Sequence, residues 1–335
     1  MDQRTVAKRR FYRIIEYFET SKNNNDDGAY KRPQLVRFTY EYALSEESRD
    51  NLLRAFFRAM ALSMDDDTQS IDFEELRLRF FGFADHLLDN FFLPLKASTK
   101  KTLQPTPTFR STFGEVQGAP AFVGTPARIS ALRGDCLVRD HHRCVISRKF
   151  DQAVATSRFN CDGDAALDDD GDLLSGASFD VLEVAHILPR SLVTVNSDSQ
   201  LVCFALEGAD IDRPRNAITL THTLHYHFGG FKIFFEPDNQ QPHTYRINSF
   251  LPRYISRDLG LPTTRMLYLT STRTIDPPSP RLLAVHRAIA HILHFSAVGE
   301  YIDKLLRDMD EKDIQADGST ELDRMLRLRL GSVAG

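Results

Sequence analysis

The sequence predicts an α+β protein in which a central segment of short strands is flanked by helical regions at both ends. Apolar residues recur at helical spacing in both terminal parts, and short β-branched or aromatic runs separated by turn residues occupy the middle. We therefore expect a helical region over residues 1–96, a linker over 97–125 and a compact domain with small antiparallel hairpins over 126–260. Residues 261–335 are expected to form a C-terminal helical region that packs on this domain.

The N-terminal region is expected to contain three helices. Apolar residues at helical spacing mark the first two, over residues 11–18 and 52–60. Ser45 is a candidate N-cap for the second of these helices, because acidic residues follow it in the first turn. A third helix is predicted over residues 72–93, where Pro94 would stop it.

Short strands and one helix are expected in the central segment. Its strand-like runs are residues 144–146, 181–188, 201–206, 231–236 and 244–247. A helix-like run starts near Asn216, and the turn at residues 237–239 is typical of a hairpin connection. Farther along, Pro280 suits the first turn of a helix, and a second apolar stripe follows at residues 301–309.

The overall charge is mildly acidic, with a formal net charge of −4. Nucleic-acid-binding proteins usually carry a basic excess, but six aspartates between Asp162 and Asp172 account for this sum. We expect these aspartates in a solvated surface loop. The chain has no apolar run of roughly 18 residues and no secretory h-region, and four cysteines do not make a disulfide framework. These features predict an intracellular protein of the cytoplasm or nucleus, without a membrane anchor.

Three pieces of sequence that can carry chemistry follow one another in a fixed order. The first is Arg-Asp-His-His-Arg-Cys-Val-Ile-Ser at residues 139–147. The second is Glu-Val-Ala-His-Ile-Leu-Pro-Arg at residues 183–190. The third begins at Asn216 and contains His225 nine residues later. Each piece alone is a weak signal, but the order of a histidine on a strand, an asparagine and a second histidine on a helix is specific.

This order resembles the HNH endonuclease family, whose fold is the ββα-metal module. The resemblance rests on the Arg-Asp-x-x-x-Cys-Val-Ile opening, the Ala-His-Ile strand and the Asn-x8-His helix, and it covers roughly residues 130–320. The segment at residues 299–309 also resembles one that follows the module in filamentous fungi, so the chain looks like that fungal branch. The N-terminal helical region carries no motif of the family.

The resemblance implies hydrolysis of phosphodiester bonds in nucleic acid, with DNA as the expected substrate. It makes His186 the general base that activates water, a role that suits an imidazole titrating near neutral pH. Asn216 would be a structural amide that keeps the base in place, and His225 a metal ligand. The implied cofactor is a divalent cation, Mg²⁺ in the first instance, with Mn²⁺ or Zn²⁺ as alternatives.

The sequence departs from the fuller family pattern at two ligand positions. Relatives often place Asp or His directly before the base, where this chain has Ala185. Glu183 lies two residues earlier and points to the same side of a strand, so it is the candidate replacement ligand. One helical turn after His225 stands Gly229, and His222 on the same helical face is the candidate substitute there.

Basic residues surround these pieces and have two interpretations of similar weight. They are Arg139, Arg143, Arg148, Lys149 and Arg190. They form either a solvated basic face or a set of phosphate contacts that position a duplex without identifying its bases.

Two hypotheses remain open from the sequence alone. In the first, the chain is a metal-dependent endonuclease. In the second, it is a catalytically silent module that binds nucleic acid or a protein partner, with the flanking helices as the interaction surface and the N-terminal helices as candidates for contact with a protein partner. Convergence of His186 and His225 with either Glu183 or His222 would favour the enzyme, whereas placement of the two histidines on opposite sides of the fold would argue against it.

Overall fold

A computed structural model describes residues 3–20, 30–66, 70–99, 126–189, 211–238, 240–270 and 274–311. These residues group into two units. One holds the described parts of Met1–Ser98 and Ala288–Gly335, and the other those of Thr99–Val193 and Ala205–Arg287. The domain limits expected at residues 96, 125 and 260 stay predictions, as does the packing of residues 261–335 on the central domain.

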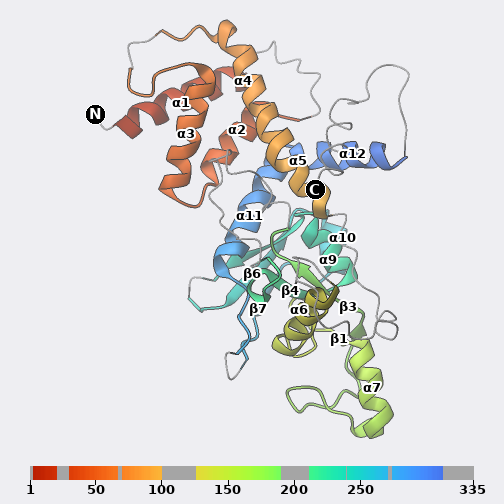
Figure 1. Cartoon of the computed structure of the whole chain (residues 1–335). Coiled ribbons are helices and arrows are strands. Elements are labelled where there is room, and N and C mark those ends of the chain that lie inside the picture. The colour runs from red at the N-terminus through yellow and green to blue at the C-terminus, as the bar shows by residue number, and fades with distance from the viewer. Residues whose placement is uncertain are drawn as a thin grey trace, which may run out of the picture. The chain divides into compact units, whose positions relative to one another are not determined.

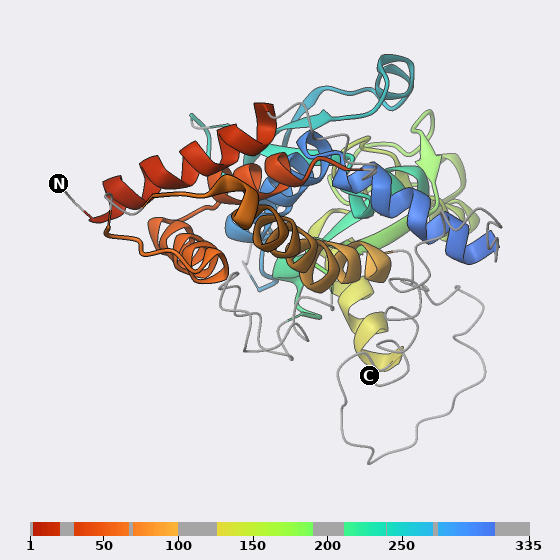
Figure 2. The same ribbon diagram turned by 90° about the horizontal axis from the view of Figure 1, so that it is seen from above.

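The first unit contains four helices that pack around an aromatic core. The helices are α1 (Gln3–Thr20), α2 (Arg32–Glu41), α3 (Glu46–Met60) and α4 (Phe73–Leu87). Figures 1 and 2 show them side by side. Phe18 stacks on Phe80 with ring centroids 4.5 Å apart, and Phe11 meets Phe56 edge to face at 4.9 Å. These phenylalanines are fully buried, which confirms the helical periodicity expected for this region.

The ends of these helices confirm one predicted signal and correct another. Ser45 caps α3, since its hydroxyl oxygen accepts a hydrogen bond from the Ser48 amide at 3.1 Å. Pro94 does not stop the third helix: a π-helical turn at Leu88–Phe92 follows α4, and α5 (Leu93–Thr99) continues beyond it. The wider turn lies where the proline ring would clash with a preceding carbonyl, so the helix passes the proline.

Two further helices follow near the C-terminus. Pro280 begins α11 (Pro280–Phe295), as expected, and α12 (Val298–Glu311) carries the second apolar stripe. No single helix in the described ranges is both long and apolar enough to cross a membrane. Only α11 and α12 together, as a pair bent by 82°, have that length and composition.

The second unit is built around an antiparallel strand pair. Strand β3 (Leu182–His186) pairs with β4 (Ala217–Thr221), so that Leu182 lies opposite Thr221 and His186 opposite Ala217. Helix α6 (Pro126–Arg139) packs on this pair, and α9 (His222–Gly229) follows β4 without a break. The helix-like run predicted from Asn216 is therefore wrong at its start, because its β-branched residues pair with β3 before the helix begins.

The remaining strands lie in two small sheets of the second unit. Strands β5 (Ile233–Pro237), β6 (Thr244–Ser249) and β7 (Thr263–Met266) form an antiparallel sheet, which confirms the predicted hairpin. The short helix α10 (Arg253–Asp258) connects the last two of these strands. Residues 144–146, predicted as a strand, form a turn, in which the Val145 amide donates to the Thr219 carbonyl at 2.9 Å. The predicted strand at residues 201–206 lies outside the described residues.

The aspartate-rich segment belongs to a separate lobe of this unit. The lobe comprises β1 (Phe150–Asp151), β2 (Phe179–Asp180), α7 (Gln152–Asp162) and a short 3-10 turn, Gly163–Ala165. The expectation of a solvated loop is wrong for Asp168, which is buried. Its carboxylate accepts from Arg143 and from the amides of Asp170 and Asp172 at 2.9 and 2.8 Å. The ion pair with Arg143 thus holds this part of the acidic segment against the rest of the unit.

Candidate functional site

Asn216 ties together the two chain segments that flank the strand pair. Its side chain is fully buried. The amide oxygen accepts from the Leu188 N–H at 3.0 Å, and the amide nitrogen donates to the carbonyls of Leu188 and Ile211, each at 3.0 Å. The chain leaving β3 is thereby fastened to the chain that leads into β4. These contacts are those of a structural amide that uses its donor and acceptor groups fully.

His186 is the last residue of β3 and contacts a buried carboxylate. Its Nε2 lies 3.1 Å from Oδ1 of Asp212. The Asp212 side chain has no exposed surface, whereas 14% of the His186 side chain is exposed. The imidazole is therefore largely buried, and a small part of its surface is open to solvent.

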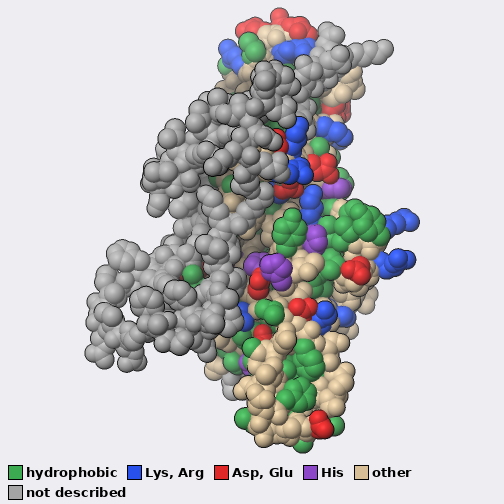
Figure 3. Space-filling model, turned by 90° about the vertical axis from the view of Figure 1, so that its right-hand side faces the viewer, with side chains coloured by type: hydrophobic (Ala, Val, Ile, Leu, Met, Phe, Trp, Pro, Cys, Tyr) green, Lys and Arg blue, Asp and Glu red, His purple; other side chains and the backbone are tan. Residues whose placement is uncertain are grey.

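Glu183 gathers two histidines of α9 around its carboxylate. Oε2 lies 2.6 Å from Nδ1 of His225, and Oε1 lies 2.9 Å from Nδ1 of His222. The hydrogen bond from His225 lowers the pKa of Glu183 to about 2, with the bond from His222 adding to this and burial opposing it. His222 is 77% exposed, so the cluster opens to solvent. On the face of the molecule in Figure 3, histidine side chains lie beside acidic ones.

The strand register explains why this cluster forms. Because Thr221 pairs with Leu182, α9 begins beside Glu183. His222 and His225 are three residues apart in the first turns of α9 and share one helical face. The two imidazoles therefore reach the same carboxylate.

His186 does not join the cluster. Side chains alternate between the two faces of a strand, so His186 lies on the face of Val184 and Glu183 on the opposite face with Ala185. Val184 packs with Leu132 and Cys136 of α6, which identifies its face as the one covered by that helix. Of the four residues expected to converge, the structure thus brings Glu183, His222 and His225 together and places His186 apart.

The donor chemistry of the Glu183 cluster suits a divalent cation, although the cluster is not arranged as a coordination shell. One carboxylate and two imidazoles are ligands that Zn²⁺ and Mn²⁺ accept, while Mg²⁺ prefers oxygen. In the described part of the chain, however, no group of three or more His, Cys, Asp or Glu side chains is placed to hold a metal ion. Here the imidazole nitrogens are bonded to the carboxylate itself. Gly229 ends α9 and contributes no ligand.

Arg139 is not part of a phosphate-binding face. Its side chain is fully buried and forms a two-pronged ion pair with Asp140, with both bonds at 2.8 Å. It also donates to the carbonyls of Pro214 at 2.6 Å and Ala217 at 2.9 Å. The predicted phosphate contact is therefore wrong for this residue, because its donors are used inside the protein.

The other predicted basic residues are partly occupied by contacts within the protein. Arg143 pairs with Asp168, and the Arg148 guanidinium lies 4.3 Å from the Tyr268 ring centroid. Burial lowers the pKa of Arg148. Lys149 is 43% exposed and lies 2.9 Å from Asp180. Arg190 lies outside the described residues, so its contact with nucleic acid stays a prediction.

Sequence reasoning missed two aspartates of this region. Asp140 accepts from Arg139 and from the Thr219 amide at 3.1 Å, and Asp212 contacts His186. Asp140 follows Arg139 directly, which hints at a pair. For Asp212, nothing in the sequence separates it from Asp210, since both precede Asn216 in the same short acidic stretch.

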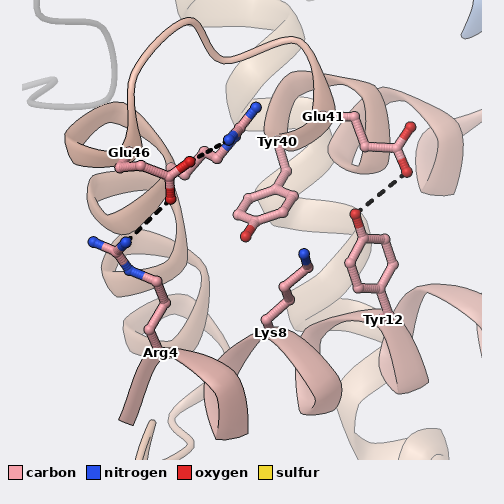
Figure 4. A pocket seen from close by; sticks show the side chains of 7 residues that line it. Arg4, Lys8, Tyr12, Tyr40, Glu41 and Glu46 are labelled. Atoms are coloured by element: carbon pink, nitrogen blue, oxygen red, sulfur yellow. Dashed lines mark hydrogen bonds and ion pairs between the residues drawn. The ribbon is translucent and has the colours of Figure 1, made fainter. Parts of the chain in front are cut away.

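A pocket of about 270 Å³ lies among the helices of the first unit (Figure 4). Lys8 and Tyr40 point into it, while Arg4 pairs with Glu46 at 3.1 Å and the Tyr12 hydroxyl contacts Glu41 at 3.4 Å. Its arginine and glutamate side chains largely neutralise each other. The lining therefore carries a single excess positive charge, that of Lys8.

The antiparallel pair of β3 and β4 runs directly into α9, and one glutamate and two histidine side chains lie at this junction. Residues 144–236, which contain this junction, match the family model of HNH endonucleases. The match supports the predicted resemblance and a nuclease class for this segment, which is less than half of the chain. No curated protein and no solved structure matches the chain.

Proposed function

We propose that this protein is a divalent-cation-dependent endonuclease that hydrolyses phosphodiester bonds in DNA. The observation that carries the proposal is the convergence of Glu183, His222 and His225 at the start of α9, within the segment that matches the HNH endonuclease model. HNH nucleases generally use a divalent metal. A site of this chemistry needs donors for a cation, a base for water and a rigid support for both.

The cation is proposed to bind at the Glu183 cluster. His225 is one ligand. Glu183 takes the position that Ala185 leaves open, and His222 takes the position that Gly229 leaves open. The Glu183 carboxylate is an oxygen donor already gathered with two imidazoles, and a cation bound there would take the place of their hydrogen bonds to the carboxylate. A bound divalent cation would neutralise charge on the phosphate and on the leaving oxygen.

His186 is proposed as the general base and Asn216 as its support. In-line displacement places the attacking water and the leaving oxygen on opposite sides of the phosphorus atom. His186 lies on the opposite face of β3 from Glu183, so this role requires a phosphate bound at the end of the strand, where His186 is the last residue. By the criterion drawn from the sequence, this placement weighs against the enzyme and favours the second candidate function. Asn216 holds Leu188, two residues after the base, and so fixes the end of the strand.

The second candidate function is a catalytically silent module that binds nucleic acid or a protein partner. Ala185 favours it, because this side chain cannot ligate a metal, and so do the bonds that both imidazoles already make to Glu183. An interaction of the N-terminal helices with a protein partner stays a prediction. Cleavage measurements separate the two functions.

The test is nicking of supercoiled plasmid by the full chain with Mg²⁺, Mn²⁺ or Zn²⁺, compared among wild type, His186→Ala and His225→Ala. His294→Ala is the matched control, since this histidine is exposed on α11 in the other unit. We expect cation-dependent nicking by wild type and control, and a loss of at least 100-fold in both site variants, in the range typical of general base catalysis, about 10²–10⁴. Equal activity in all four proteins would rule out this site. No cleavage with any cation, together with retained DNA binding, would establish the silent module.

A further inference from the structure

We propose that Asp212 is a positioning residue for His186, which it holds in the tautomer with the proton on Nε2 and the lone pair on Nδ1. This inference rests on the proposed function for its catalytic meaning. The Asp212 side chain is fully buried, and its Oδ1 is 3.1 Å from Nε2 of His186. An ionised carboxylate only accepts hydrogen bonds, so the imidazole nitrogen that faces it must carry the proton.

The surrounding backbone fixes Asp212 from both sides. The carbonyl of Ile211 accepts from the side-chain amide of Asn216 at 3.0 Å, and the carbonyl of Arg213 accepts from the backbone N–H of Asn216 at 2.9 Å. The aspartate therefore lies between two anchored neighbours. Asn216 thus supports both partners of the pair, since it also holds Leu188 beyond His186.

The remaining ring nitrogen is the one available for chemistry. Nδ1 of His186 makes no hydrogen bond to any residue in the described ranges, and the side chain is 14% exposed. With Nε2 protonated, Nδ1 is the unprotonated nitrogen that can take a proton from water. The buried carboxylate then stabilises the imidazolium that forms, as carboxylates do in other histidine-based hydrolytic sites.

The tautomer can be measured without any assay of activity. We expect the ¹⁵N chemical shifts of histidine-labelled full-length protein at pH 8 to show His186 protonated on Nε2 in the wild type. His186→Gln assigns the signals. A wild-type spectrum with the proton on Nδ1 of His186 would overturn the inference, whether or not the protein cleaves DNA.

Asp212→Asn tests the consequence for catalysis. Its amide group can donate to Nε2 and so move the proton to Nδ1, which removes the base. We expect the ¹⁵N shifts to change to the Nδ1-protonated form and the nicking kcat to fall on the order of 10³-fold or more, with KM little changed because the Asp212 side chain is buried and does not face the substrate. Asp151→Asn is the matched control: Asp151 is buried and caps α7, and asparagine caps a helix as well.

The outcomes separate the two proposals. If the wild type cleaves DNA but Asp212→Asn retains its kcat or the Nε2-protonated tautomer, the positioning role is wrong and the nuclease stands. If the wild type does not cleave DNA but the tautomer responds to Asp212→Asn, the positioning role stands and the nuclease proposal fails.

Discussion

Replacement of Asn216 by alanine is expected to destabilise the second unit strongly, because its side chain makes three buried hydrogen bonds. Asn216→Ala would leave the Leu188 N–H and the carbonyls of Leu188 and Ile211 without these partners. Leu188 and Ile211 are themselves buried, so water does not replace the lost bonds easily. Each unsatisfied group costs about 1–3 kcal/mol, but contributions within one network do not simply add.

We therefore expect the free energy of unfolding to fall by about 3–5 kcal/mol in Asn216→Ala, a large part of the 5–15 kcal/mol typical of a domain. Urea denaturation measures the loss, and hydrogen exchange of the Leu188 amide locates it, because this amide should exchange much faster in the variant. Asn248→Ala is the control, since the Asn248 side chain donates to the exposed Glu236 at 2.9 Å and its loss should change stability by less than about 1 kcal/mol. An equal loss in both variants, or unchanged exchange at Leu188, would refute the reasoning.

Asn216→Asp adds a pH test of the same contacts. One carboxylate oxygen keeps the bond from the Leu188 N–H, but the other faces two carbonyls that cannot donate. The site disfavours the ionised form, so the pKa of the introduced acid should lie above its unfolded value. A raised folded pKa means that the variant regains stability as the pH falls. We expect the difference from wild type to be smaller at pH 5 than at pH 7, and the opposite trend would contradict the hydrogen-bond assignment.

Three further predictions concern other parts of the molecule. Arg139→Lys should lower stability by about 3 kcal/mol in urea denaturation, although the charge is kept, because lysine cannot replace the two-pronged pair with buried Asp140. Burial lowers the pKa of His286 to about 3, so the folded state should lose about 2 kcal/mol between pH 7 and pH 5 as the unfolded histidine takes up protons; His286→Gln should flatten this dependence. Asp72→Ala should cost about 1 kcal/mol, since Asp72 caps α4 through the amides of Glu74 and Glu75, and Asp72→Asn should cost little.

The sequence predicted the parts of the fold that depend on local patterns. Helical periodicity gave α1, α3 and α11, and the hydroxyl of Ser45 gave the start of α3, because caps and periodicity act within a few residues. The run after Asn216 was harder, since its apolar residues suit a strand or a helix equally. Pairing with β3, a segment some thirty residues away, decides in favour of a strand.

The sequence predicts which residues form the Glu183 cluster, but it does not predict the contact between His186 and Asp212. Glu183 and His222 were expected as substitutes for the missing ligands, and the structure brings both to His225. The separation of His186 from this cluster also follows from alternation along a strand, although the partner of His186 does not. Asp212 reaches it through the turn before β4, and no local pattern reports such a tertiary contact.

The buried contacts of Arg139 and Asp140 with β4 help to set the register between β3 and β4. Register is critical, because a slip of one residue would exchange the faces of β3 and move Glu183 away from α9. Arg139 donates to the carbonyl of Ala217, and Asp140 accepts from the amide of Thr219, so one buried ion pair holds two alternate backbone groups of β4. A slip in which β4 moves would break both bonds and leave the buried ion pair without these two backbone partners, which is costly. Arg139, for which the sequence leaves a solvated basic face or a phosphate contact open, thus fixes β4 from within, and with it the start of α9 beside Glu183.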